Sequence, residues 1–100
     1  MTTSMKMLIL LYSGTEPHRI AALLDEQHAG GYTELRGGHG VGATGRHEGN
    51  RAWPGESTLF VSVIPVDVAA PLVETLRDAA NRLPAGERLH VALVPTETFF

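Results

Sequence analysis

Hydrophobic and polar positions follow two different periods along the chain, and their succession predicts four strands and two helices. A continuous apolar stretch at 6–13 is too short for a helix and is typical of a strand buried on both faces of a sheet. The β-branched and aromatic run at 58–64 predicts a second such strand. The short, half-polar segment at 32–36 predicts an edge strand, and the alternation over 88–94 predicts a half-buried one.

Two segments between these strands instead repeat their apolar residues at about 3.6 positions, which predicts helices. The first is expected to begin at Thr15-Glu16-Pro17, where a hydroxyl would cap free amides, and to stop at Gly30-Gly31. The second is expected to begin at Asp67, with Pro71 tolerated because it falls in the first turn, and to end at Pro84-Ala85-Gly86. The positions expected on the two buried faces are Ile20, Ala21, Leu23 and Leu24, and then Ala69, Leu72, Val73, Leu76, Ala79, Ala80 and Leu83.

The resulting order βαββαβ predicts an α+β fold, the ferredoxin-like sandwich, as one domain over residues 1–100. In this fold both helices cover the same face of a four-stranded sheet. Because the strands at 6–13 and 58–64 are apolar on both faces, the second face also needs a cover. Oligomerisation is the simplest way to supply it.

Composition removes several classes of protein. The chain of 100 residues has no Cys, which excludes a disulfide scaffold, a thiolate zinc site and a cysteine enzyme. The longest apolar run, at 7–11, is far shorter than the roughly 20 residues of a membrane helix, and no secretory signal pattern accompanies it. We therefore expect a cytoplasmic protein without membrane insertion. A net charge of −3 gives no global field for binding nucleic acid.

Residues 37–57 contain seven of the eleven glycines and follow no apolar period, which predicts a long loop between the second and third strands. A loop of this length in so small a domain is more often functional than idle. Its glycines allow backbone amides to converge on phosphate or carboxylate oxygens, and its arginines add charge-assisted hydrogen bonds. The competing interpretation is a flexible hairpin loop with solvated arginines.

Three parts of the chain carry a resemblance to a known family. They are the segment Gly31-Tyr32-Thr33-Glu34-Leu35-Arg36-Gly37-Gly38, the Gly/Arg loop after it, and the later strand ending in Ile64-Pro65. With the buried first strand and the two helices, they resemble the PII and PII-like signalling proteins over about residues 6–95. The family implies a trimer whose sheets line a central barrel. It also implies an effector site in each cleft between subunits, and a long T-loop that docks onto a transporter, enzyme or regulator.

The chain departs from the PII proteins proper in two places. Residues 82–89 lack the T-G-x-x-G-D-G-K-I type of segment that holds ATP phosphates, and residues 37–57 lack the modified tyrosine. The resemblance is therefore to compact, divergent PII-like proteins, which are often associated with the transport of bicarbonate, metals or other small solutes. Control of nitrogen assimilation through ATP and 2-oxoglutarate is not what these residues imply.

On this resemblance we expect a non-enzymatic regulator that binds a small anionic effector between the subunits of a homotrimer. An adenine nucleotide, ATP, ADP or AMP, is the expected effector. Its binding would order the 37–57 segment and so control a protein partner such as a transporter. Trp53 is the candidate contact to that partner, or else it fixes the base of the loop. The residues expected to bind the effector are Arg36, Gly37, Gly38, Gly40, Arg46, Arg82 and Arg88.

His39 and His47 support an alternative hypothesis, a PII-like module linked to heavy-metal homeostasis. Neutral imidazoles are ligands for Zn, Cu, Ni or Co, and a neighbouring subunit would complete the set. Their spacing matches no recognised ligand motif, so two surface histidines are the competing interpretation. Two further hypotheses are a scaffold trimer that binds no effector, and a small ferredoxin-like oxygenase or isomerase with His39 or His90 as base. The enzyme would lack the expected acid partner.

Overall fold

The structure is a computed structural model that describes residues 4–27, 29–42, 45–47 and 56–100. Its elements, in chain order, are β1 (Met5–Gly14), α1 (His18–Glu26), β2 (Thr33–Gly38), β3 (Gly40–Gly42), β4 (Gly45–His47), β5 (Glu56–Pro65), α2 (Val66–Asn81) and β6 (Arg88–Thr96).

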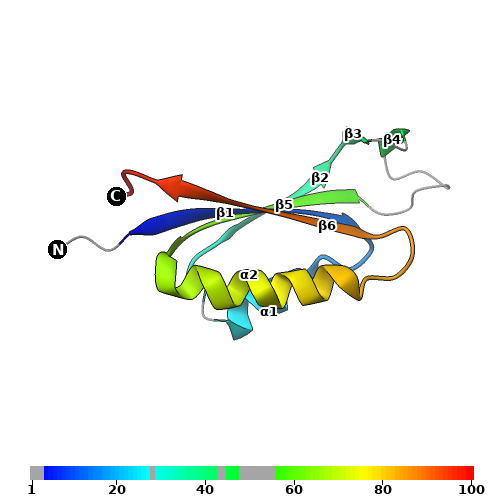
Figure 1. Cartoon of the computed structure of the whole chain (residues 1–100). Helices are drawn as coiled ribbons and strands as arrows, with labels where there is room; N and C mark the ends of the chain where they lie inside the picture. The colour runs from blue at the N-terminus through cyan, green and yellow to red at the C-terminus, as the bar shows by residue number, and fades with distance from the viewer. Residues whose placement is uncertain (1–3, 28, 43–44, 48–55) are drawn as a thin grey trace.

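Four of the strands form one antiparallel sheet in the order β2-β5-β1-β6, and both helices lie on the same face of it (Figure 1). This is the βαββαβ arrangement of the ferredoxin-like fold, so the predicted fold class is confirmed. The prediction of β2 as an edge strand is confirmed as well, since it pairs with β5 alone in the sheet. Within the described part of the chain, no helix has the length and apolar character needed to cross a membrane.

The core lies between the sheet and the helices. It is built by alternate residues of β1 and β5 packed against one face of each helix, as the two hydrophobic periods predict. Of the predicted helix positions, Ala21, Leu23, Val73, Ala80 and Leu83 are partly buried against this core. The largest fully buried side chains are Leu8, Leu10, Tyr12, Ile20, Leu24, Phe60, Ile64, Leu72 and Leu76.

The start of α1 differs from the prediction. The helix begins at His18 with Pro17 as its N-cap residue, and no side-chain hydrogen bond caps it. The prediction that a hydroxyl at the Thr15-Glu16-Pro17 segment caps the helix was therefore wrong. The first helical amides are instead served by the chain just before them, because the N–H groups of Arg19 and Ile20 donate to the carbonyls of Glu16 and Pro17.

The position of Pro71 in α2 also corrects the prediction. The helix begins at Val66, whose N–H donates to the carbonyl of Ser4 at 3.0 Å, so Pro71 lies in the second turn rather than the first. There its ring removes one intrahelical hydrogen bond, a defect of about 3 kcal/mol in an isolated helix. The helix continues through it because Leu72 and Leu76, both fully buried, hold its inner face against the sheet.

The 37–57 segment is not all loop. β2 continues to Gly38, β5 begins at Glu56, and the short strands β3 and β4 pair with each other between them. The ladder between β2 and β5 shifts register between Leu35 and Gly38, at a bulge where Gly37 has a φ of 78°. Glycine adopts this left-handed conformation without strain. Trp53, like the rest of 48–55 and residues 43–44, lies outside the described residues.

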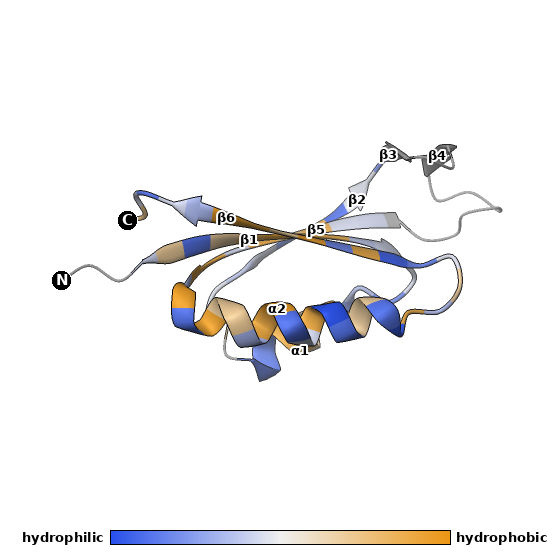
Figure 2. Cartoon of the chain, in the orientation of Figure 1, coloured by the Kyte–Doolittle hydropathy of each residue, from blue (hydrophilic) through white to orange (hydrophobic). Residues whose placement is uncertain are grey.

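The sheet face turned away from the helices is also apolar; on it Ile9 and Leu11 of β1 pair with Val61 and Leu59 of β5, which confirms the prediction for the two central strands. Leu11 on β1, Leu35 on β2 and Val94 on β6 are 47%, 56% and 41% exposed. Figure 2 shows hydrophobic colouring along the strands at the middle of the sheet as well as on the helices below it. We refer to this surface as the open face.

Candidate functional site

At one end of the sheet, four residues on four strands lie in a single row. Gly38 on β2 is the cross-strand partner of Ser57 on β5. Ser57 is in turn the partner of Ser13 on β1, and Ser13 is the partner of Arg88 on β6. The hydroxyl oxygens of Ser13 and Ser57 are 3.1 Å apart and share a hydrogen bond. We call Gly38, Ser57, Ser13 and Arg88 the end row.

The side chains of the end row belong to the open face. The residues next to them on the strands, Tyr12, Thr58 and Leu89, are buried among the core side chains. Because consecutive side chains of a strand point to opposite faces, Ser13 and Arg88 point away from the helices. The end row is therefore a polar border to the apolar open face.

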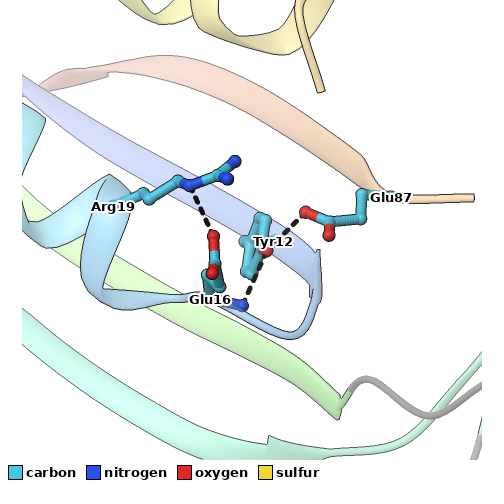
Figure 3. Close-up of polar contacts among 4 residues, drawn as sticks. All are labelled: Tyr12, Glu16, Arg19 and Glu87. Atoms are coloured by element: carbon cyan, nitrogen blue, oxygen red, sulfur yellow. Dashed lines mark hydrogen bonds and ion pairs between the residues drawn. The ribbon is translucent and has the colours of Figure 1, made fainter. Parts of the chain in front are cut away.

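Behind the end row, on the helix side, the phenol of Tyr12 joins three segments of the chain (Figure 3). Tyr12 is fully buried. Its hydroxyl donates a hydrogen bond to Glu87 Oε1 at 2.6 Å and accepts one from the backbone N–H of Glu16 at 3.0 Å. The carboxylate of Glu16 pairs in turn with Nε of Arg19 at 2.6 Å. One phenol thus connects the end of β1, the start of α1 and the turn that leads into β6.

Two features keep this contact in place. Burial raises the pKa of Tyr12 from 10.0 to about 12, and the hydrogen bond to Glu87 acts in the same direction. The phenol is therefore a protonated donor throughout the physiological range. Gly14 makes room for the contact, since a Cβ at this position would overlap the phenol oxygen and lie 2.7 Å from Glu87 Oε1.

The turn between α2 and β6 carries two of the predicted binding residues. Arg82 is the C-cap residue of α2, and Arg88 is the first residue of β6; both are exposed. Between them the chain reverses with Gly86 at a φ of 88°, and the N–H of Glu87 donates to the carbonyl of Pro84 at 3.0 Å. The turn therefore presents both cations at the end of the molecule that holds the end row.

The other predicted binding residues lie on or beyond β2. Arg36 is exposed on this edge strand, where its guanidinium pairs with the carboxylate of Glu34. Gly37 and Gly38 follow it at the bulge. Gly40 is on β3, and Arg46 is on β4 opposite Val41, with its side chain outside the described residues.

The predicted residues form two groups rather than one pocket. Arg36, Gly37 and Gly38 lie at the β2 edge of the sheet, whereas Arg88 lies at the β6 edge and Arg82 precedes the turn that leads into it. Two strands separate the edges, so Gly38 and Arg88 are roughly 14 Å apart at a spacing of about 4.8 Å between strands. Both groups lie at the same end of the sheet.

The structure gives the metal hypothesis no support. His39 follows β2 and is exposed, and the backbone of His47 pairs with Gly40 on β3 while its side chain is outside the description. Among the residues that the structure describes, no group of three or more His, Asp or Glu is placed to hold a metal ion.

His90, the candidate base of the enzyme hypothesis, borders a groove of about 470 Å³ between α2 and β6, but its cross-strand partner is Leu11, so its side chain points to the open face. The other polar residues that line the groove are Arg77 and Asn81. No carboxylate of the described residues lines this groove, so it does not supply the acid partner that such a base would need.

Four residues of this region were missed by the sequence analysis: Tyr12, Ser13, Ser57 and Glu87. One local signal was available, because Tyr12 has the one hydroxyl within the apolar run at 7–12 and stands two residues before a glycine. Its partner Glu87 is 75 positions away, and the meeting of Ser13 and Ser57 depends on the strand register. Neither contact has a local signature.

Three solved structures illustrate what the chain is similar to. CPII, a nitrogen regulatory PII-like protein from Thiomonas intermedia bound to ADP, AMP and bicarbonate, superposes with a TM-score of 0.68 at 19% identity, over 93% of this chain and 94% of that chain. The same protein bound to ADP and bicarbonate gives a TM-score of 0.67 at 22% identity, over 95% and 90%. A candidate PII-like signalling protein from Thermus thermophilus gives 0.62 at 17% identity, over 94% and 90%. No protein-family model and no curated protein sequence matches the chain.

Proposed function

Because the chain has the fold of the PII-like proteins, we propose that it is a non-enzymatic PII-like regulator that binds an adenine nucleotide between the subunits of a homotrimer. The observation that carries the proposal is the position of the cationic and glycine-rich segments. They lie at one end of the sheet but on its two opposite edges. Two edges that are separated by two strands within a chain meet only when the β2 edge of one subunit faces the β6 edge of the next.

The open face supports the trimer. Leu11, Leu35 and Val94 would be withdrawn from water if three such faces met around a common axis. The polar end row would then border the contact between subunits, since it lies at the margin of the same face. A ring of this kind brings opposite edges of neighbouring sheets together three times, once in each cleft.

The chemistry of the two edges suits a phosphate-bearing ligand. Arg82 and Arg88 on one edge provide exposed guanidinium groups, which make strong, often bidentate hydrogen bonds to phosphate. On the other edge, Gly37 and Gly38 allow the backbone to approach a ligand closely, and Arg36 adds a third cation. An incoming phosphate would compete with Glu34 for Arg36. The structural neighbour CPII binds ADP, AMP and bicarbonate, which favours an adenine nucleotide as the ligand.

Regulation follows from the connection between this edge and the 37–57 segment. β2 leads directly from Arg36 through the bulge into β3. A ligand held at the bulge would therefore change the backbone conformation at the start of the 37–57 segment. The two states of the segment would differ in affinity for a protein partner, such as a transporter, and Trp53 is the candidate contact to it.

The test has two parts. Light scattering measures the oligomeric state of the protein, and isothermal titration calorimetry measures its binding of ADP, AMP and ATP. We expect a trimer that binds at least one of these nucleotides, and a loss of about tenfold or more in affinity for Arg88→Ala. Arg77→Ala is the matched control, since it removes the same charge from an exposed position of α2 on the helix side. If the unmodified protein binds none of the three nucleotides, the proposal is contradicted and a scaffold that binds no effector is favoured.

A further inference from the structure

The hydroxyl of Tyr12 is not needed to fill the core. A phenylalanine would occupy the same fully buried place on β1 without a polar group to satisfy. The hydroxyl is tolerated there because it has two partners, the Glu16 N–H and the Glu87 carboxylate. The hydroxyl therefore connects β1 to the start of α1 and to the turn before β6, and these segments meet behind the end row.

The connection lies next to the cationic edge of the site. Tyr12 directly precedes Ser13, Glu87 directly precedes Arg88, and Ser13 and Arg88 are the last cross-strand pair between β1 and β6. The Tyr12–Glu87 hydrogen bond therefore fastens the chain at the point where the β1–β6 ladder stops and the turn begins. Leu83 anchors the other side of the turn by packing against the core.

We propose that the Tyr12 hydroxyl is a positioning group for the ligand: through Glu87 it fixes the turn at 82–87, and with it the direction of Arg82 and Arg88. This inference rests on the proposed function, because it concerns the same nucleotide site. Glu16 is part of the arrangement, since its N–H holds the phenol oxygen from the side of α1. Loss of the hydroxyl removes this link between the turn and β1, leaves the turn held by the packing of Leu83 and its backbone hydrogen bonds, and lets the two arginines spread over more positions.

The charge of Glu87 provides an independent argument. A carboxylate beside Arg88 opposes the binding of an anion, so it is an unfavourable residue at this place on electrostatic grounds alone. Its position is explained if the carboxylate is needed to accept the hydrogen bond from the buried phenol. The charge of Glu87 should weaken the binding of an anion, whereas its hydrogen bond to Tyr12 should strengthen it. A variant that removes the charge and keeps the hydrogen bond separates the two effects.

The variants are Tyr12→Phe, Glu87→Ala and Glu87→Gln, with the dissociation constant for ADP measured by calorimetry. Tyr12→Phe and Glu87→Ala both remove the hydrogen bond, and we expect each to weaken ADP binding by roughly tenfold. Glu87→Gln keeps an oxygen that accepts from the phenol and removes the negative charge. We expect it to bind ADP as well as the unmodified protein or more tightly.

Two controls separate positioning from general destabilisation. Tyr32→Phe removes the other phenol hydroxyl, outside the end row, and Glu97→Ala removes an exposed carboxylate beyond the far end of β6. Both should leave the dissociation constant unchanged, whatever they do to the melting temperature. Without ligand, hydrogen exchange of the amides of Leu83 and of 85–88 should be faster in Tyr12→Phe and Glu87→Ala and unchanged in Glu87→Gln.

The outcomes are distinguishable. If the unmodified protein binds no nucleotide, the proposed function fails and this inference fails with it. If the unmodified protein binds ADP and Tyr12→Phe and Glu87→Ala bind it equally well, only the positioning role is overturned. Should Tyr12→Phe not fold, the two Glu87 variants decide. Tighter binding by Glu87→Ala would mean that the carboxylate acts only as a charge and would overturn the inference, whereas weaker binding by Glu87→Ala that Glu87→Gln restores would support it.

Discussion

The two faces of the sheet are built by the same strands and have different tasks. On β1, Leu10 is fully buried beneath the helices, whereas Leu11, the next residue, is 47% exposed on the open face. The hydroxyls differ in the same way, since that of Tyr12 is buried with two partners and that of Ser13 borders the open face. One face therefore carries the stability of the single chain, and the other is available for association.

The largest effect should come from Leu10→Ala on the helix side. Truncation of a fully buried leucine leaves a cavity, so the free energy of unfolding should fall by about 2–5 kcal/mol. The measurement is chemical denaturation followed by circular dichroism. Leu11→Ala is the matched control on the neighbouring position; at a concentration at which the chain is monomeric, an equal loss in both variants would contradict the division between the two faces.

The second prediction concerns alkaline pH. The pKa of Tyr12 is raised to about 12 in the folded chain, chiefly by burial and then by the hydrogen bond to Glu87. The stabilisation is therefore complete below pH 10 and is lost as the pH rises through the folded pKa. A rise from 10.0 to about 12 corresponds to roughly 3 kcal/mol.

The test is to follow the free energy of unfolding of the unmodified protein and of Tyr12→Phe between pH 9 and 12. The stability of the unmodified protein relative to Tyr12→Phe should fall over this range, because the variant has no phenol to ionise at this site. A difference that stays constant with pH would show that the Tyr12 proton is not linked to folding.

A smaller effect is expected for Ser13→Ala in the end row. The variant removes one hydroxyl of a half-buried pair 3.1 Å apart, and a hydrogen bond of this kind contributes about 0.5–1.5 kcal/mol. Thermal unfolding should show a loss at the lower end of this range, and Ser57→Ala should match it. If the double variant loses twice as much as either single one, the two hydroxyls do not interact.

Leu11→Glu should have the smallest effect on the fold of the single chain. It should also have the largest effect on the association of the subunits. A charge on the open face does not disturb the core, so the circular dichroism spectrum should stay the same. The proposed trimer should dissociate into folded monomers, because burying an unpaired carboxylate in the contact is strongly unfavourable. Light scattering measures the mass, and a Leu11→Glu protein that keeps the mass of the unmodified protein would place the contact elsewhere.

The fold was predictable because its signals are local. The apolar run at 7–11, the strand at 58–64 and the helical periods each fix one element from its own residues. The missing cap of α1 is a local error, whereas the error at the start of α2 falls where a distant part of the chain intervenes. α2 begins early because its first N–H reaches the Ser4 carbonyl, and its buried leucines carry it past Pro71.

The candidate site was predictable only in part, for the same reason. Arg36, Gly37 and Gly38 are neighbours in the sequence, and so are Arg82 and Arg88 at the two sides of one turn. That both groups lie at the same end of the sheet follows from register, which no local pattern encodes. Their role in binding a ligand stays a prediction, as does the role of Trp53, which lies outside the described residues.

The edges of the sheet carry features that discourage unlimited strand addition. On β6, Pro95 cannot donate a main-chain hydrogen bond to a further strand. On β2, the paired charges of Glu34 and Arg36 and the bulge at Gly37 interrupt a flat, regular edge. A chain with an apolar face and two open sheet edges is at risk of growing into fibrils, and these interruptions oppose that growth.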